Sequence, residues 1–235
     1  MKRKTVTIVP ACVQQNNHLA LLRAFMLTHK ATCDSIMHIY LNEVFTDQHE
    51  AFAVMATKEA KSLGYFCHRW EDDFDLSKIY QRGKDETDSD YIFYALQDTV
   101  VTGDWLTPLQ ILLDTGLYHS AQGLSTQCNK YNTGEDAPTD VYAHEPMFGG
   151  HYLMRRDNGF DWPVDDVSTF YTHHWYCYWL KHHGLKAVLC KDSHINHLEG
   201  DICNTKEMSS VDWNKIEPRE RELMGQQEWS EKGND

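Results

Sequence analysis

The sequence predicts an α/β fold in which a mostly parallel, twisted central sheet carries helices on both faces. Strand-like and helix-like segments alternate through the first half of the chain, which is the pattern of a parallel sheet. The 235 residues are enough for one large domain or two small ones. The hydrophobic fraction of 41%, with 12 tyrosines and seven tryptophans, suffices for a packed core.

The elements of the first half follow from local patterns. Leu19, Leu22, Phe25 and Met26 are spaced as on one face of a helix. A second helix has Asp47 as its expected cap and ends before Gly64. The expected strands are 5–9, 36–41, 65–70 and 91–96, and the expected helices are 16–28, 47–63, a short one within 71–83, and 105–113.

The second half is less regular. Residues 120–146 are rich in loop-forming side chains, and we expect short strands at 151–156 and 186–190 around a helix over 167–184. We predict one domain over 1–205, made of a nucleotide-sugar-binding half (1–103) and an acceptor and catalytic half (104–205). The polar tail, 206–235, contains a surface-helix pattern.

Composition excludes several classes of protein. The chain has no apolar run of 18 residues, so we expect no membrane span and a cytoplasmic location. Seven scattered cysteines without a CxxC pair argue against a disulfide framework and a thiolate zinc site. The net charge of −13 repels phosphodiester backbones at long range. GxGxxG and GxxxxGK[ST] are absent, which argues against a standard dinucleotide fold and a P-loop NTPase.

Asp98 is the first candidate functional residue. The apolar strand Tyr91 to Leu96 ends in Gln97-Asp98, and ligands bind at strand carboxyl ends in α/β folds. A carboxylate there is costly to bury unless it is paired or bound. Asp98 is therefore either an Asx-turn residue or part of a site for a divalent cation or a substrate hydroxyl.

Two further patterns are also open. His194 and His197, just after the last expected strand, are either surface or core histidines or metal ligands, since their spacing alone is a weak signal. Asp165 and Asp166 precede a helix, so at least one of them could cap it. The other could act as a general base.

Arg155 and Arg156 end the strand 151–156. The guanidinium group suits phosphate oxygens, although two arginines after a strand are more often solvated. His173 and Trp175 belong to an aromatic-rich helix pattern that fits either a core or a pocket wall.

Taken in order, these segments resemble the family 2 glycosyltransferases, which have the GT-A fold. The similar segments are VTIVPACVQQNNHLALLRAF, YALQDTVVTGDWL, GGHYLMRRDNGFDW and LKHHGLKAVLCKDSHINH, which together run from residue 5 to about 200. Asp98 stands at the family's metal-site aspartate, and His197 at its late histidine. The chain departs from the family at Leu96, which replaces the first acid of D-x-D. It departs again at Thr172-His173, which occupy the place of the acidic pair.

The resemblance implies transfer of a sugar from a nucleotide-diphosphate sugar, such as a UDP-sugar, to an acceptor hydroxyl, with inversion. Asp98 and His197 would hold Mn²⁺ or Mg²⁺, the mixed donor set favouring Mn²⁺. Asp166 would be the base, with Asp165 next and His173 as an outsider. Expected donor contacts are Pro10, Ala11, Cys12, Asn42, Gln97, Asp98, Arg155 and Arg156. Expected acceptor contacts are Gly149, Gly150, Trp162, His173 and Trp175.

Three alternatives stay open at this point. The same fold could act on a hydroxymethylated base in DNA, as some bacteriophage enzymes do, so that the acceptor is a saccharide or modified DNA. The chain could instead be a nucleotide-sugar-binding module that has lost catalysis. A metallohydrolase that uses the histidines is the third reading. The oligomeric state is not predicted.

Overall fold

The computed structural model of the chain describes residues 3–41, 46–70, 75–124, 140–142, 151–162, 176, 179–180 and 183–198. Its helices are α1 (Asn16–Thr32), α2 (Asp47–Ser62), α3 (Leu76–Glu86) and α4 (Leu106–Asp114). Its strands are β1 (Thr5–Ala11), β2 (Ile36–Leu41), β3 (Phe66–Arg69), β4 (Tyr91–Tyr94), β5 (Thr99–Thr102), β6 (Ser120–Leu124), β7 (Asp140–Tyr142), β8 (Tyr152–Arg155) and β9 (Lys186–His197).

All of these strands belong to one sheet, in the order β3-β2-β1-β4-β8-β6-β9-β5, with β7 beside β9. Strands β1, β2, β3 and β4 run parallel to one another, as the alternation of strands and helices predicts. Strand β8 is antiparallel to both β4 and β6, and β9 is parallel to β6 but antiparallel to β5 and β7. The α/β class is confirmed, and the second half of the sheet is mixed in direction.

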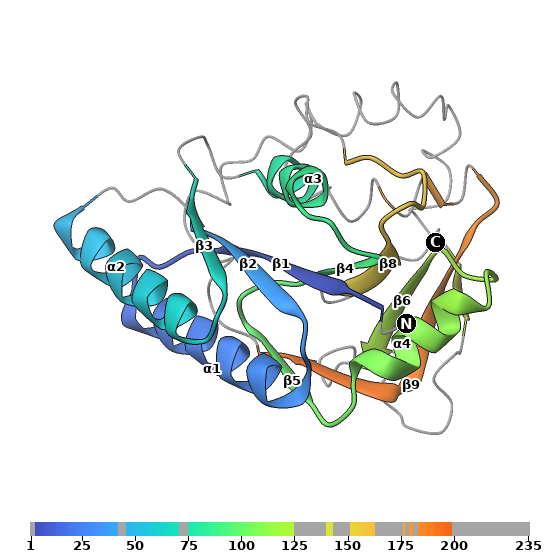
Figure 1. Cartoon of the computed structure of the whole chain (residues 1–235), viewed down its shortest axis with the longest axis horizontal. Helices are drawn as coiled ribbons and strands as arrows, with labels where there is room; N and C mark the ends of the chain where they lie inside the picture. Colours follow the sequence, from blue (N-terminus) through green and yellow to red (C-terminus); the bar gives the residue numbers. More distant parts are fainter. Residues whose placement is uncertain are drawn as a thin grey trace, which may run out of the picture.

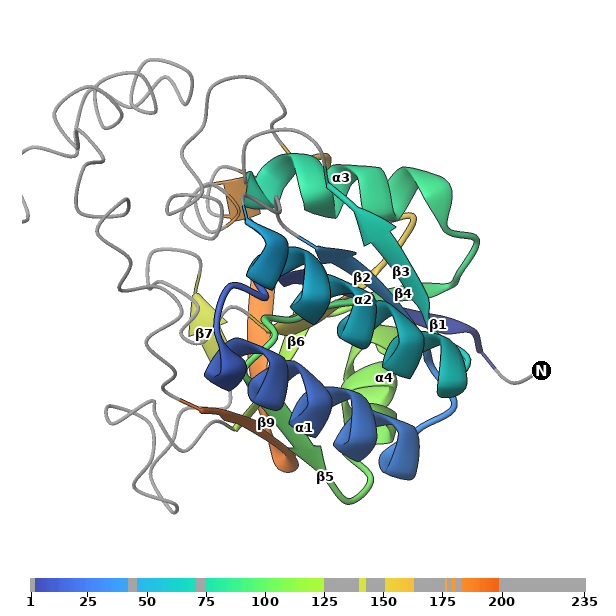
Figure 2. The same ribbon diagram turned by 90° about the vertical axis from the view of Figure 1, so that its left-hand side faces the viewer.

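Helices cover both faces of the sheet, as expected. Helix α3 lies on one face, and α1 and α2 lie next to each other on the opposite face (Figures 1 and 2). Alternation along β1 explains the two layers, because Val6 and Ile8 pack with α3 while Val9 and Ala11 pack with α1 and α2. No helix among the described residues is long and apolar enough to cross a membrane.

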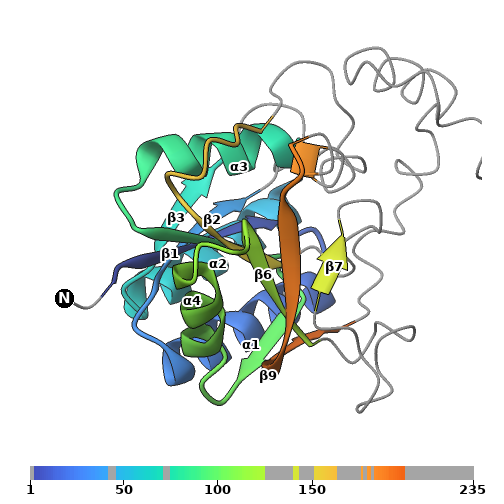
Figure 3. The ribbon, with the colours of Figure 1, turned by 90° about the vertical axis from the view of Figure 1, so that its right-hand side faces the viewer.

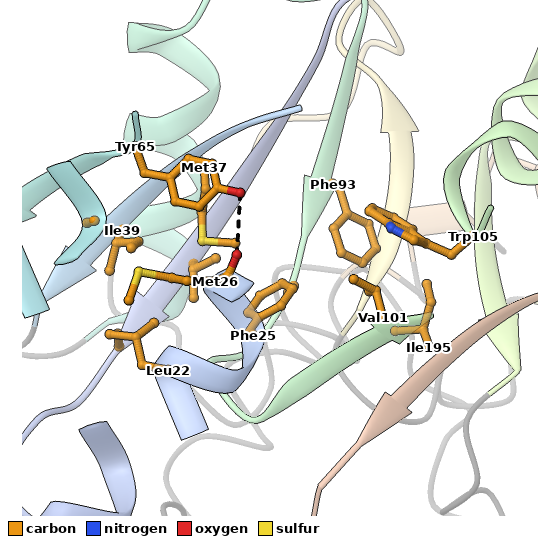
Figure 4. Close-up of a cluster of buried hydrophobic side chains, with 14 of the residues drawn as sticks. Leu22, Phe25, Met26, Met37, Ile39, Tyr65, Phe93, Val101, Trp105 and Ile195 are labelled. Carbon is orange, nitrogen blue, oxygen red and sulfur yellow. Dashed lines mark hydrogen bonds between the residues drawn. The ribbon is translucent and has the colours of Figure 1, made fainter. Parts of the chain in front are cut away.

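The larger core cluster joins the two halves of the sheet (Figure 4). Phe25 of α1 and Phe93 of β4 belong to the same buried cluster as Val101 of β5 and Ile195 of β9. Trp105, which is 0% exposed, packs its indole 4.6 Å from the Phe93 ring between centroids. The far strands β9 and β5 therefore curl back to share one core with α1.

Strand β9 is longer than its local sequence suggests. We expected a strand over 186–190, but β9 continues to His197 because its second half pairs with β5. Strands β6 and β7 lie in a stretch expected to be loop, and both pair with β9 (Figure 3). Partners distant in sequence stabilise these strands, and no local pattern reports such partners.

Candidate functional site

The candidate site lies where the parallel strands of the first half end. Strands β1, β2 and β4 end at Ala11, Leu41 and Tyr94, and parallel pairing brings these ends to the same edge of the sheet. Crevices at this edge are where open α/β sheets bind ligands. Pro10 and Ala11, both expected donor contacts, are buried within β1, and Cys12 follows them with 9% exposure.

Asp98 lies at this edge, in the turn between β4 and β5, and is 3% exposed. Its backbone carbonyl accepts a hydrogen bond of 2.7 Å from the amide of Leu198, and Thr99 pairs with His197 in the β5–β9 ladder. The structure thus places the backbones of Asp98 and His197 side by side, although about 100 residues separate them in the sequence. Convergence of their side chains stays a prediction.

Gln97, the residue before Asp98, is 3% exposed and bonds to the loop between β1 and α1. Its Nε2 donates to the carbonyl oxygens of Cys12 (2.8 Å) and His18 (3.1 Å), and its Oε1 accepts from the Cys12 amide. We expected this side chain to contact a donor nucleotide, but its polar atoms are hydrogen-bonded to the protein backbone.

Two histidines at this edge carry no signal in the sequence. His18, in the first turn of α1, is 1% exposed, and its pKa is lowered by burial and secondarily by His49. Its Nδ1 has no hydrogen-bond partner among the described residues. His151 is 0% exposed and precedes Tyr152, the residue that pairs with Tyr94 at the end of β4. The pairing of β8 with β4 places His151 opposite the residue after Tyr94, at the same edge of the sheet.

Arg155 and Arg156 lie at the opposite edge of the sheet. Strand β8 runs antiparallel to β4, so Arg155 pairs with Tyr91 at the amino end of β4. That position is about 10 Å along the strand from Tyr94, before the turn to Asp98 is added. Arg155 forms an ion pair with Asp157 (3.2 Å), and Arg156 donates to a backbone carbonyl of α3. The expectation that they contact the donor phosphates does not fit this geometry.

Trp162 is a core residue. It is 2% exposed and packs among aromatic rings from three other elements, with centroids 5.1 Å from Tyr80, 5.2 Å from Tyr94 and 6.0 Å from Tyr152. Its indole is not available to stack on an acceptor sugar, which corrects that expectation. The G-F-D segment before it is held to α3, because Lys84 forms an ion pair of 2.7 Å with Asp161.

The remaining predicted site residues lie outside the described part of the chain: Asn42, Gly149, Gly150, Asp165, Asp166, His173 and Trp175. Nothing is described of the His197 side chain either. Within the described residues, no group of three or more histidine, cysteine or acidic side chains is placed to hold a metal ion. The structure therefore describes only part of the predicted site.

Sequence comparisons give no relative of this chain, since no protein-family profile and no curated protein matches it. Solved structures do match. A structure of S. aureus TarS in complex with UDP-GlcNAc has a TM-score of 0.67 at 9% identity, covering 94% of this chain and 65% of its own. The mannosyltransferase PcManGT from Pyrobaculum calidifontis, in complex with GDP-Man and Mn²⁺, has a TM-score of 0.63 at 11% identity and covers 83% and 57%.

GalNAc-T7 with UDP, GalNAc and Mn²⁺ has a TM-score of 0.61 at 11% identity, covering 84% of this chain and 45% of its own. The chain thus spans less than two thirds of the length of each of these three proteins. At such low identity the likeness establishes the fold alone. All three are glycosyltransferases of the GT-A type, and the fold of this chain is the GT-A fold of glycosyltransferases that use nucleotide-sugars.

Proposed function

We propose that the chain is a glycosyltransferase that moves a sugar from a nucleotide-diphosphate sugar to an acceptor hydroxyl, with a divalent cation and with inversion at the anomeric carbon. The observation that carries the proposal is Asp98, a buried carboxylate at the carboxyl edge of a GT-A sheet, beside the backbone of His197. Structures of this fold were solved with UDP-GlcNAc and with GDP-Man, so both nucleotides are candidates here.

Asp98 and His197 are the residues that we assign to the cation. Asp98, in the turn just before β5, supplies one carboxylate, and His197, at the end of β9, supplies one imidazole, a donor set that suits Mn²⁺ better than Mg²⁺. The first acid of the family's D-x-D is replaced by Leu96, so water or donor phosphate oxygens would complete the coordination. A cation bound there would stabilise the negative charge that develops on the leaving diphosphate.

The acceptor chemistry is assigned to Asp166, with Asp165 as the second choice and His173 as the third. The carboxylate would take the proton from the acceptor hydroxyl while the oxygen forms a bond to the anomeric carbon. The bond from that carbon to the diphosphate oxygen breaks on the opposite face, and its electron pair leaves with the diphosphate. This single displacement accounts for the proposed inversion.

The first test is Asp98→Ala, with His197→Ala beside it. We expect each variant to lose binding of UDP or GDP in the presence of Mn²⁺, and to lose transfer by about 10²-fold or more, because the charge on the diphosphate loses its partner. Isothermal titration calorimetry with both nucleotides, with and without Mn²⁺, measures the binding. Product assays with UDP-GlcNAc and GDP-Man measure transfer.

Asp88→Ala is the matched control, since the Asp88 side chain is 100% exposed at the amino end of β4 and should not affect binding. Near-normal Mn²⁺-dependent nucleotide binding by Asp98→Ala would remove the assigned site. Failure of the wild-type chain to bind either nucleotide would remove the proposed function.

A further inference from the structure

The side chain of Gln97 closes a gap between two backbone segments. Strand β4 ends at Tyr94, and the last backbone hydrogen bond of the β1–β4 ladder runs from the Ala95 amide to the Ile8 carbonyl (3.1 Å). Beyond this bond, the N–H of Cys12 donates to the side-chain oxygen of Gln97, and the C=O of Cys12 accepts from the side-chain nitrogen of Gln97. A primary amide can pair in this way with the N–H and C=O of a single residue, so Gln97 extends the ladder past the end of β4.

The same amide reaches a third segment. The second hydrogen of its Nε2 points to the carbonyl of His18, in the first turn of α1, at 3.1 Å. Both hydrogens and the oxygen of the amide are therefore used within the protein, at a residue that is 3% exposed. Gln97 thus ties the end of β1, the start of α1 and the turn that carries Asp98 into one unit.

We infer that Gln97 is a positioning residue: it does not contact the donor but sets the distance between the β1–α1 loop and Asp98. This inference rests on the proposed function, together with the expectation that Pro10, Ala11 and Cys12 contact the nucleotide whose diphosphate meets the cation held by Asp98. Because Gln97 and Asp98 are neighbours in sequence, a displacement of the amide moves the carboxylate and the loop relative to each other. A substitution of Gln97 should therefore weaken binding of the donor, although it alters neither the β1–α1 loop nor Asp98 itself.

The chemistry demands an amide of this length. A carboxylate at position 97 would keep the acceptor for the Cys12 amide, but it would face the carbonyl oxygens of Cys12 and His18 with no hydrogen to donate. Methionine has nearly the same shape and forms none of the three bonds. Asparagine keeps the amide but is one methylene shorter, so it cannot reach both segments at once.

The experiment compares Gln97→Met and Gln97→Glu with wild type, using UDP and GDP in the presence of Mn²⁺ as probes. We expect the dissociation constant of the nucleotide that wild type binds to rise about tenfold or more in both variants, and more in Gln97→Glu than in Gln97→Met. Hydrogen exchange should become faster in residues 12–19 and stay unchanged at the amino ends of β1 and β4. Gln97→Asn serves as a milder third variant should the other two fail to fold.

Gln110→Met is the matched control. The Gln110 amide donates to the Thr5 hydroxyl (2.8 Å) at the amino end of β1, so this variant loses a hydrogen bond at the opposite edge of the same strand. Its nucleotide affinity should stay within about twofold of wild type, even where its melting temperature falls as far as that of Gln97→Met. Weaker binding in both variants alike would show a general loss of stability and overturn the inference.

The outcomes separate the inference from the function on which it rests. Wild-type binding together with unchanged binding by Gln97→Met overturns the inference and leaves the proposed function standing. Absence of nucleotide binding by wild type overturns both. Weaker binding by Gln97→Met, with faster exchange confined to residues 12–19, supports both.

Discussion

At the residue scale, the buried histidines show how position decides the chemistry of a side chain. His29 of α1 is 0% exposed, and its two ring nitrogens meet the hydroxyls of Thr7 and Tyr65, each at 2.8 Å. Burial lowers its pKa to about 3, with a smaller contribution from the charge of Lys30. His29 is therefore neutral in the folded protein and serves as a hydrogen-bonding bridge between α1, β1 and the start of β3.

The pKa of His29 predicts how stability depends on pH. The folded pKa, about 3, lies below the unfolded value of 6.5, so the unfolded chain takes up a proton first as the pH falls. This contribution to stability is full above pH 6.5 and is lost as the pH falls from 6.5 toward 3. The loss is at most about 1.4 kcal/mol per pH unit, or about 2 kcal/mol between pH 6.5 and 5.

Urea unfolding of wild type and His29→Gln, from pH 8 to pH 5, measures the effect. The free energies of unfolding should differ most at pH 8 and approach each other as the pH falls. Parallel curves over the whole range would show that His29 does not account for the acid sensitivity.

Gln97 and Asp98 give a second example at this scale. The sequence marks both as candidates, but only the hydrogen bonds of Gln97 to Cys12 and His18 show that its amide is already used. Asp98 keeps its predicted place at the end of β4. Two neighbouring polar residues thus have different roles, and the roles are decided by the groups that surround each residue in the fold.

At the element scale, the contact between α3 and β1 sets how closely a helix can approach the sheet. Gly83 of α3 lies over Ile8 of β1, and a Cβ added at Gly83 would come within 2.9 Å of both Cγ1 and Cγ2 of Ile8. Ile8 is 0% exposed, so it could move away from an added Cβ only by shifting its packed neighbours. The glycine is required here for close approach, in spite of its low helix propensity.

Gly83→Ala should cost about 1–3 kcal/mol of unfolding free energy through overpacking. The higher helix propensity of alanine should return ~1 kcal/mol of this loss. Ile8→Val removes the outermost methyl group of Ile8, so the double variant should recover part of the loss. Chemical denaturation of both single variants and the double variant gives the coupling energy. Additive effects in this cycle would show that the two side chains do not clash.

At the scale of the whole molecule, Trp105 connects the two halves of the sheet. Its indole donates to Thr32 of α1 (3.0 Å), its ring packs on Phe93 of β4, and its carbonyl accepts from the Ser193 hydroxyl of β9 (2.7 Å). The curl of the sheet is maintained where these three elements meet. Removal of the indole should consequently affect the domain as one unit.

Trp105→Ala should cost about 3–5 kcal/mol of unfolding free energy, because it leaves a large buried cavity. Far-ultraviolet circular dichroism and tyrosine fluorescence should report the same midpoint, as expected for one cooperative domain. Ile111→Ala on α4, at a side chain that is 60% exposed, is the control and should change stability by less than about 0.5 kcal/mol. Two separate transitions in Trp105→Ala would mean that the halves unfold independently.

The sequence determined the elements whose signals are local. Strands β1, β2 and β4 and helices α1, α2 and α4 occur where their apolar patterns place them, with differences of a few residues at the ends. The position of Asp98 after β4 follows from the same local signal, because an apolar run that stops shortly before a carboxylate indicates where the strand ends. The apolar periodicity of a helix or strand and the positions of its ends depend on short stretches of sequence. They can therefore be predicted from a single sequence.

Only the tertiary structure decided the direction of the strands and the use of the site residues. Strand β6, with the sequence SAQGL, has weak strand propensity and forms because β8 and β9 pair with it on either side. Arg155 and Arg156 are at the far edge because β8 runs antiparallel to β4. Strand direction and pairing depend on contacts between residues far apart in the chain, and the energies of those contacts appear only once the chain has folded.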